Sequence, residues 1–215
     1  MSKLALYGYW RSSCSYRVRI ALNAKGLSYA YHAVNLVEQA QSQAAYTEKS
    51  PTGYVPCLVI DGEAFVESMA ILELLEDLHP EPRLLPRDPG ARAHVRALCE
   101  IVNAGIQPLQ NLNVIRRVSE DFAQQKAWMQ HFIGKGLRAF ETRLARLEES
   151  GVSGPFSYGE AFGLADCLLV PQVYAARRNS VDLSGMPRVM RADAAASALD
   201  FVRAAHPDLQ PDARP

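Results

Sequence analysis

Residues 10–22 read WRSSCSYRVRIAL, and this stretch decides how the first half of the chain is interpreted. The preceding residues 4–7, LALY, are typical of a short apolar β-strand, and Gly8 permits a tight exit from it. From Val18 onward, apolar residues recur at helical spacing. The chain is therefore predicted to run from a strand through a polar elbow into a helix.

The elbow carries side chains that suit a negatively charged ligand. Three hydroxyls, a thiol and a guanidinium come together in Arg11, Ser12, Ser13, Cys14 and Ser15. They lie at a helix start, where backbone N–H groups are unpaired and the helix dipole favours negative charge. A second interpretation is purely structural, with Ser12 or Ser13 as an N-cap and Cys14 as a small buried side chain.

Composition and charge narrow the class of ligand and the compartment. The 215 residues are 48% hydrophobic, and 23 basic residues balance 23 acidic ones, so no overall field attracts nucleic acid or an anionic membrane. The four cysteines form no CxxC pair, which favours a reducing compartment and predicts neither a disulfide framework nor a metal site. The N-terminus lacks the apolar core of a signal peptide, and no apolar run approaches the roughly 18 residues of a membrane span. We expect a cytoplasmic protein with a small-molecule ligand, no nucleic-acid partner and no membrane partner.

Further along, the pattern predicts a small sheet. Three segments rich in β-forming residues are predicted strands: 29–36, 57–60 and 64–66. Residues 37–49 are expected to form a loop or short helix, and Asp61-Gly62 turns the last two strands into a hairpin. Pro56 opens this hairpin and leaves the backbone of Val55 at an edge where it can pair with an extended ligand. An ordinary edge proline is the alternative.

A helix is predicted after the hairpin, with Ser68 as its N-cap and His79-Pro80 as its end. The Ser68 hydroxyl and the free backbone amides of the first helical turn also suit a ligand carboxylate. Residues 80–90, PEPRLLPRDPG, contain four prolines and mark a domain boundary. Beyond this boundary the periodicity is helical, and no second sheet is predicted.

The helical half has three notable segments. Residues 105–113 interrupt the helices with glycine, proline and amide side chains. Residues 164–173 predict a buried helix in which Asp166 stands at the third position and accepts from the amide of the N-cap, Gly163. A last helix is expected over 189–205, followed by a frayed tail.

Taken together, these features resemble the glutathione transferase architecture over the whole chain. Residues 12–22 are similar to the signature of its zeta class, the maleylacetoacetate isomerases, and residues 105–112 and 166–172 also resemble this class. The resemblance implies a thioredoxin-like N-terminal domain over 1–80, a Pro-rich linker over 81–90, and an all-helical C-terminal domain over 91–215 that contributes to the substrate site. Gly163 departs from the Ser or Thr that the family usually carries there.

Glutathione is the cofactor that the resemblance implies. Ser12 is expected to hold its thiolate, with Ser13 and Cys14 assisting. The remaining contacts implied for glutathione are Val55 before a cis Pro56, Glu67 and Ser68 for the γ-glutamyl amine and carboxylate, and Gln107, Asn111, Leu112 and Asn113 from the second domain. A glutamine within residues 41–43 is expected at the glycine end, with the choice left open.

The implied reaction is the cis–trans isomerisation of maleylacetoacetate to fumarylacetoacetate in aromatic amino acid catabolism, as in tyrosine breakdown. The substrate is a diketo acid, a side activity as a glutathione transferase is expected, and the protein is expected to be a homodimer. Arg11, and Arg177 or Arg178, are candidates for meeting the substrate carboxylates. An exposed salt bridge is the alternative for Arg177 and Arg178.

Three rival functions remain open at this point. Maleylpyruvate isomerisation needs the same thiolate and similar arginines. A thiol–disulfide enzyme would use Cys14 itself as the nucleophile. A non-catalytic carrier of apolar ligands would show no dependence on glutathione.

Overall fold

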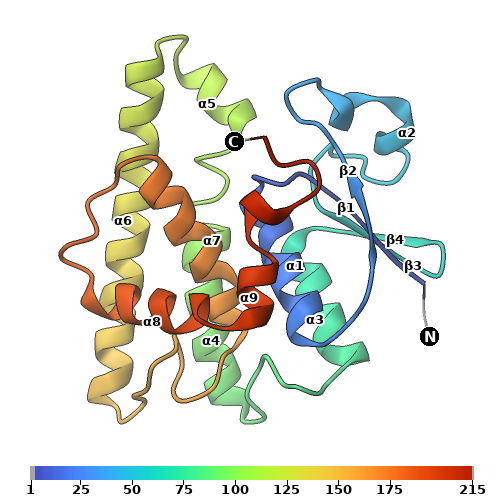
Figure 1. Ribbon diagram of the computed structural model, residues 1–215. Coiled ribbons are helices and arrows are strands. Elements are labelled where there is room, and N and C mark those ends of the chain that lie inside the picture. The colour runs from blue at the N-terminus through green and yellow to red at the C-terminus, as the bar shows by residue number, and fades with distance from the viewer. Residues whose placement is uncertain (1–2, 215) are drawn as a thin grey trace. The chain divides into compact units, whose positions relative to one another are not determined.

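The computed structural model describes residues 3–214, and the chain divides into two compact units (Figure 1). Unit 1 comprises Met1–Arg83 together with Leu199–Pro215, and unit 2 comprises Leu84–Ala198. Unit 1 therefore contains segments from both ends of the sequence. Among the described residues, no helix is long and apolar enough to span a membrane.

Unit 1 is built on a four-stranded mixed sheet. Its strands are β1 (Leu4–Gly8), β2 (Ala30–Ala33), β3 (Cys57–Ile60) and β4 (Glu63–Val66). The order across the sheet is β2-β1-β3-β4, with β1 parallel to β2 and antiparallel to β3. The predicted strands and hairpin are confirmed, although β2 is shorter than the predicted 29–36. Together with the helices, this sheet confirms the thioredoxin-like fold of the first half.

Two helices lie side by side against one face of this sheet: α1 (Ser13–Ala24) and α3 (Ser68–Leu78) (Figure 1). The core contains Leu6 and Leu58 from the central strands, Ile20 from α1, and Ile71 and Leu75 from α3, all fully buried. The segment between β2 and β3 holds η1 (Ala40–Ser42) and α2 (Ala44–Thr47), in agreement with the expected short helix. Burial of apolar side chains on one face of each element accounts for this arrangement.

The C-terminal segment differs from the sequence-based expectation. In place of one helix over 189–205, the structure has α8 (Pro187–Ser197) and then α9 (Asp200–Ala204), because Leu199 adopts an extended conformation. The tail is not frayed: it continues through η2 (Pro207–Leu209) and packs within unit 1. Leu199–Pro215, which were expected in the second domain of 91–215, therefore belong to unit 1.

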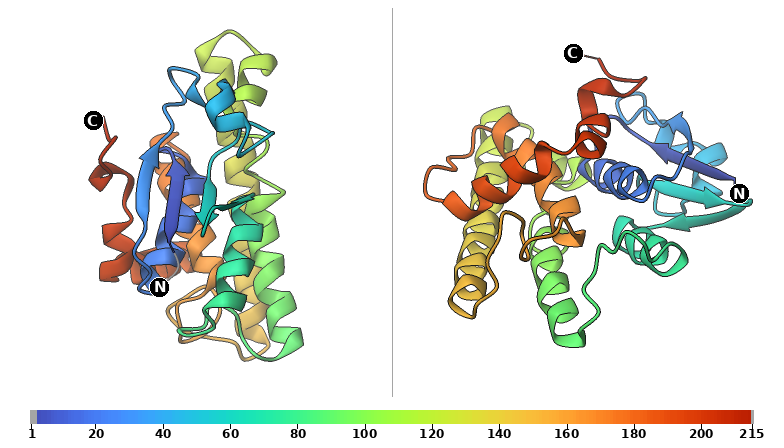
Figure 2. Two further views of the ribbon diagram at one scale, coloured as in Figure 1. Left: turned by 90° about the vertical axis from the view of Figure 1, so that its right-hand side faces the viewer. Right: turned by 60° about the horizontal axis from the view of Figure 1, so that its bottom comes forward.

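Unit 2 is helical, as expected from the periodicity. Besides α8, its helices are α4 (Pro89–Asn103), α5 (Leu112–Val118), α6 (Phe122–Glu149) and α7 (Leu164–Arg178). Helix α7 packs against α4, α6 and α8 (Figure 2). Most of its residues are buried. The predicted buried helix at 164–173 is thus confirmed, and it extends further than predicted.

The first turn of α7 satisfies Asp166 as predicted. The Gly163 N–H donates to Oδ2 of Asp166 at 2.9 Å, and the Ser157 N–H donates to Oδ1 at 2.8 Å. The absence of a side chain at Gly163 has a steric reason, because a Cβ there would lie 3.0 Å from the Leu84 carbonyl oxygen. The same oxygen accepts from the Leu164 N–H at 2.7 Å. This hydrogen bond brings the backbone at Gly163 close to the Leu84 carbonyl.

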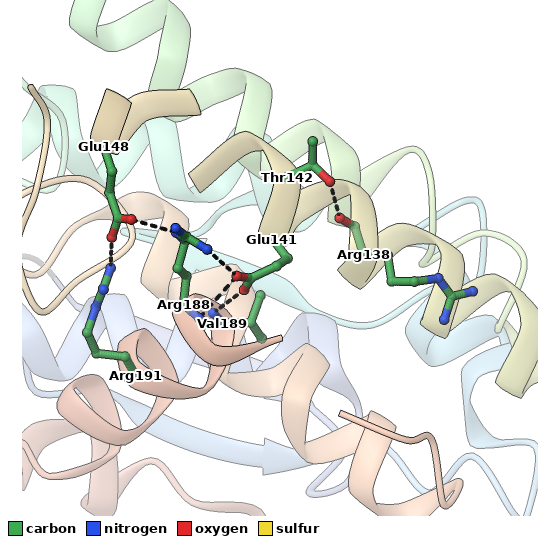
Figure 3. Close-up of polar contacts among 7 residues, drawn as sticks. All are labelled: Arg138, Glu141, Thr142, Glu148, Arg188, Val189 and Arg191. Atoms are coloured by element: carbon green, nitrogen blue, oxygen red, sulfur yellow. Dashed lines mark hydrogen bonds and ion pairs between the residues drawn. The ribbon is translucent and has the colours of Figure 1, made fainter. Parts of the chain in front are cut away.

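The N-cap residue of α8 makes no side-chain capping bond, and a side chain of α6 caps this N-terminus instead (Figure 3). Glu141 accepts hydrogen bonds from the backbone N–H of Val189 at 2.8 Å and of Arg188 at 3.3 Å. Arg188 returns a bond from Nη1 to Glu141 at 3.1 Å and reaches Glu148 through Nε at 2.5 Å. A carboxylate at a helix N-terminus is favoured by the unpaired amides and the dipole, so these contacts fix α8 to α6.

A buried ion pair joins the ends of α1 and α3 in unit 1. The Lys25 ammonium lies 2.8 Å from Oε2 of Glu76, and both side chains are almost completely buried. It also donates to the carbonyl oxygens of His79 at 2.6 Å and Pro82 at 3.1 Å. One cation therefore satisfies a carboxylate and two backbone acceptors where α3 ends.

We predict that Lys25→Met lowers the free energy of unfolding by about 3–5 kcal/mol, because Glu76 would remain as a buried charge without this partner. Urea denaturation measures the change. Lys135→Met, at an exposed lysine of α6, serves as the control and should cost little. The double variant Lys25→Met/Glu76→Leu should recover much of the loss; a single variant as stable as the parent would contradict the importance of the pair.

A second prediction concerns pH. Burial raises the pKa of Asp166 to about 6, while the N–H groups of Ser157 and Gly163 oppose this rise. The folded chain then takes up a proton between about pH 6 and 4 that the unfolded chain does not bind, so stability increases as the pH falls through this window. Relative to Asp166→Asn, the parental free energy of unfolding should rise by about 2–3 kcal/mol from pH 7 to pH 4. A relative decrease would mean that the two N–H bonds keep the carboxylate ionised in the folded state.

Candidate active site

The elbow between β1 and α1 places the Ser12 hydroxyl at a helix start. Ser12 is the N-cap of α1, and its Oγ accepts a hydrogen bond from the Ser15 N–H at 3.2 Å. A hydroxyl that accepts through a lone pair retains its proton for donation to another group. Because Ser12 is only partly buried, the capping and ligand-binding interpretations are compatible.

The backbone of the elbow is fixed by Ser15, a residue to which the sequence reasoning gave no positioning role. Its Oγ accepts from the Tyr9 N–H at 3.3 Å, and the Ser12 N–H donates to the Tyr9 carbonyl at 3.0 Å. A Cβ at Gly8 would lie 3.1 Å from the same Oγ, so glycine leaves room for this contact. The only sequence signal for it was the position of Ser15 one turn into the helix.

The other elbow residues present their side chains differently. Ser13 and Cys14 are partly buried, and Cys14 forms no disulfide. Arg11 is exposed, and its guanidinium carbon lies 5.2 Å from the centre of the Trp10 ring. A cation over an aromatic face gains electrostatic attraction, which gives the Arg11 side chain a preferred position beside the elbow.

The approach to β3 confirms the expected cis peptide bond between Val55 and Pro56. Pairing with β1 starts at Cys57, so Val55 precedes the ladder. The carbonyl of the residue before Val55, Tyr54, accepts from the hydroxyls of Tyr46 at 2.7 Å and Ser50 at 2.9 Å. Two buried side chains therefore orient the peptide that leads into the Val55 position, and burial raises the pKa of the Tyr46 hydroxyl.

The start of α3 corrects one expectation. Glu67, and not Ser68, occupies the N-cap position, and Ser68 is the first helical residue. Glu67 has φ +65°, its side chain makes no capping bond, and its carboxylate is exposed. The buried Ser68 hydroxyl accepts from Nη1 of the buried Arg17 at 3.2 Å. A serine hydroxyl, a guanidinium and the amides of a helix start are thus gathered at one place.

The backbone of Glu67 is strained, since a left-handed φ is uncommon for a residue with a long side chain. Such a conformation costs about 1–3 kcal/mol and is concentrated at active sites and ligand clamps. The observed strain at Glu67 therefore supports a binding role for the start of α3.

The segment 37–49 distinguishes the two candidate glutamines. The Gln41 amide turns toward its neighbours: Nε2 donates to Oε1 of Gln39 at 3.3 Å, and Oε1 of Gln41 is buried. The Gln43 side chain is exposed. Of the two residues, Gln43 is the more exposed.

In unit 2, one predicted residue, Gln107, belongs to a connected group of amide side chains. Gln110 donates from Nε2 to Oε1 of Gln107 at 2.7 Å and exchanges two bonds with the buried Gln172, at 3.1 and 3.2 Å. Asn111 is the N-cap of α5, accepting from the Asn113 N–H at 2.9 Å, and Leu112 is exposed. Gln110 and Gln172 lay inside the motifs quoted from the sequence, but their mutual pairing was not predicted.

The structure gives Arg177 and Arg178 local partners within unit 2. Nη2 of Arg177 lies 2.6 Å from Oδ2 of the buried Asp193, which matches the ion-pair alternative for this residue. Arg178 lies over the Tyr174 ring, with 5.8 Å between its guanidinium carbon and the ring centre.

Similarity to known proteins identifies the family of the chain. Residues 6–83 match the glutathione S-transferase N-terminal domain. Over 212 residues the chain is 45% identical to a probable maleylacetoacetate isomerase 2 of Drosophila melanogaster, covering 98% of this chain and 90% of that protein. It is also similar to the holo structure of a maleyl pyruvate isomerase described as a bacterial glutathione S-transferase of zeta class, with 40% identity, TM-score 0.94, and coverage of 98% and 100%. The chain belongs to the zeta class of glutathione transferases.

A further relative has been solved with a ligand. The maleylacetoacetate isomerase of Anaeromyxobacter dehalogenans 2CP-1, with GSH bound in its active site, is 49% identical to this chain, with TM-score 0.88 and 99% of each chain covered. Together these similarities confirm the expected fold class, with a thioredoxin-like first domain and a helical second one.

We predict that Glu67→Gly stabilises this zeta-class protein by about 1 kcal/mol, because glycine adopts φ +65° without strain. Glu67→Gln keeps the strained backbone and should leave the free energy of unfolding unchanged. Urea denaturation of both variants provides the comparison, and a loss of stability in the glycine variant would show that the backbone here is not strained.

Proposed function

We propose that the protein is a glutathione-dependent isomerase that converts maleylacetoacetate to fumarylacetoacetate. The observation that carries this proposal is the Ser12 hydroxyl, held at the start of α1 with its proton available, in a chain similar along its length to proteins of that name. The second unit is proposed to contribute to the substrate site.

The donors and acceptors of unit 1 fit the parts of glutathione. Hydroxyls at the start of α1 suit a thiolate, and the Val55 backbone before cis-Pro56 suits an extended peptide. At the start of α3, the Ser68 hydroxyl, the Arg17 guanidinium and the helix amides suit a carboxylate, and the exposed Glu67 carboxylate suits an ammonium. The remaining proposed contacts are Gln43 at the glycine end and Gln107, Asn111, Leu112 and Asn113 from the second unit.

Glutathione, when bound, supplies a nucleophilic sulfur whose reversible addition to a conjugated double bond allows that bond to rotate. A free thiol has a pKa of about 8.5, so keeping it ionised at neutral pH requires lowering its pKa by about 2 units, or roughly 2.7 kcal/mol. A helix N-terminus provides only about 0.3–1 kcal/mol, whereas a hydrogen bond to a charged group provides about 1.5–3 kcal/mol. The Ser12 hydroxyl is therefore required in addition to the helix, with Ser13 and Cys14 assisting.

For the diketo acid substrate we propose Arg11 as a carboxylate-binding residue, since it is exposed and lies at the edge of the elbow. The Arg177 guanidinium already has a carboxylate partner in Asp193, which weakens the case for a substrate role there.

Maleylpyruvate isomerisation is the second candidate function. It is favoured by the similarity in fold to the maleyl pyruvate isomerase described above, with TM-score 0.94. The shorter keto acid needs the same ionised thiol and a similar cation, so the elbow serves both substrates equally well.

The wider setting is also part of the proposal. We propose a cytoplasmic homodimer that acts in aromatic amino acid catabolism and has a side activity as a glutathione transferase. Four cysteines without a CxxC pair support a reducing compartment.

The proposal is tested by following cis–trans isomerisation of maleylacetoacetate and of maleylpyruvate, each with and without glutathione. Turnover of maleylacetoacetate that requires glutathione and exceeds turnover of maleylpyruvate supports the main proposal. The reverse preference supports the second candidate, and turnover without glutathione contradicts both.

We predict that Ser12→Ala lowers kcat/KM by about 10–10²-fold at pH 7 and shifts the pH–rate profile to higher pH, because the bound thiol loses its hydrogen-bond donor. Ser12→Thr keeps the hydroxyl and should retain most activity. A parental pH–rate profile in the alanine variant would remove Ser12 from the proposed role.

Cys14→Ala separates the isomerase from the rival thiol–disulfide enzyme. We expect substantial isomerase turnover in this variant, because the nucleophilic sulfur belongs to glutathione. Complete loss of turnover, with the fold and glutathione binding retained, would favour Cys14 as the nucleophile.

A further inference from the structure

The C-terminal segment of unit 1 reaches the elbow directly. After η2, Oδ2 of Asp212 accepts a hydrogen bond from the Trp10 N–H at 3.0 Å, across 202 residues of sequence. Trp10 itself is buried, and it stands two residues before Ser12. The end of the described chain thus contacts the backbone that leads into the candidate thiolate site.

Arg19 binds the other side of the same residue. Its Nη2 donates to the Trp10 carbonyl at 3.0 Å, and its Nε donates to the Ala205 carbonyl at 3.0 Å. The Arg19 side chain is completely buried, and burial lowers the pKa of its guanidinium, an effect opposed by Tyr31, Tyr29, Tyr16 and, least, by Asp212. Both polar groups of the Trp10 backbone are therefore tied to the C-terminal segment, one directly and one through Arg19.

This arrangement bears on Ser12 through a short path. The Ser12 N–H donates to the Tyr9 carbonyl at 3.0 Å, so residues 9–12 form a turn whose middle contains Trp10. A shift of the Trp10 peptide moves this turn and with it the Ser12 hydroxyl. Displacements of about 1 Å are enough to impair a catalytic hydrogen bond, so the residues that support such a group matter as much as the group itself.

We propose that Asp212 is a positioning residue, which fixes the turn of residues 9–12 and so aims the Ser12 hydroxyl at the sulfur; this rests on the proposed function. The clamp consists of Asp212, Trp10, Arg19 and Ala205, and it lies wholly within unit 1. Asp212 acts through the turn of residues 9–12 and its bond to the Trp10 N–H. Its carboxylate forms a charge-assisted bond, which is stronger than a neutral one and limits the freedom of the elbow.

The first test measures amide hydrogen exchange in the full chain without glutathione. In Asp212→Ala, amides of residues 9–15 should exchange about tenfold faster, as expected when one hydrogen bond is lost from a local opening equilibrium. Amides of the β3–β4 hairpin should not change. The matched control is Asp208→Asn in the same segment, where the carboxylate is 66% exposed and lies 3.7 Å from Nδ1 of His206.

The second test measures the thiol pKa of bound glutathione from its thiolate absorbance. The parent should show a pKa below that of free glutathione. Asp212→Ala should raise the bound value by about one unit, a tenfold change in the ratio of thiolate to thiol. Asp212→Asn keeps an acceptor for the Trp10 N–H but loses the charge, so its shift should be smaller, and Asp208→Asn should show none.

The outcomes separate the two proposals. If the parent lowers the thiol pKa and Asp212→Ala leaves it equally low, the positioning role is overturned while the proposed function stands. Faster exchange throughout unit 1 would also overturn it, because Asp212 would then support the fold as a whole. If the parent does not lower the thiol pKa, the proposed function fails and the positioning role falls with it. Should Asp212→Ala not fold, Asp212→Asn decides: no rise in the thiol pKa overturns the proposal.

Discussion

The hydrogen bond from the Ser15 N–H to the Ser12 hydroxyl joins the fold of this protein to its chemistry. It fixes where α1 begins, and it uses a lone pair of the Ser12 oxygen while leaving the proton available. The same Ser15 holds the Tyr9 N–H through its side chain. Ser15 thus bonds to both ends of the turn formed by residues 9–12. The position of the candidate thiolate site therefore follows from the local geometry of a strand–helix junction.

Much of this junction could be predicted from the sequence, because its structure is encoded locally. A short apolar run predicts β1, helical spacing predicts α1, and the serines between them are natural caps. The β3–β4 hairpin and the burial of Asp166 followed in the same way from Asp61-Gly62 and from the position of Asp166 in the first turn of α7. In these cases, neighbours in the sequence are also partners in the structure.

Other features were not predictable because their causes are distant in sequence. Glu67, and not Ser68, is the N-cap of α3, and the Ser68 hydroxyl instead accepts from Arg17, 51 residues earlier. The last helix divides at Leu199 because the residues after it pack on α1, where Asn23 and Arg19 hold the carbonyls of Phe201 and Ala205. The pairing of Gln110 with Gln172 spans 62 residues. Propensity and periodicity do not report on such contacts.

Unit 1 is discontinuous in sequence, because residues 199–214 belong to it although the whole of unit 2 lies between. During synthesis, α1 therefore emerges from the ribosome long before the segment that ties down the Trp10 peptide and accepts from Asn23. The thioredoxin-like fold can form its sheet early, but the elbow reaches its final hydrogen bonding only when translation has passed unit 2. The hydrogen bonding around the Trp10 peptide is thus completed only late in the synthesis of the polypeptide.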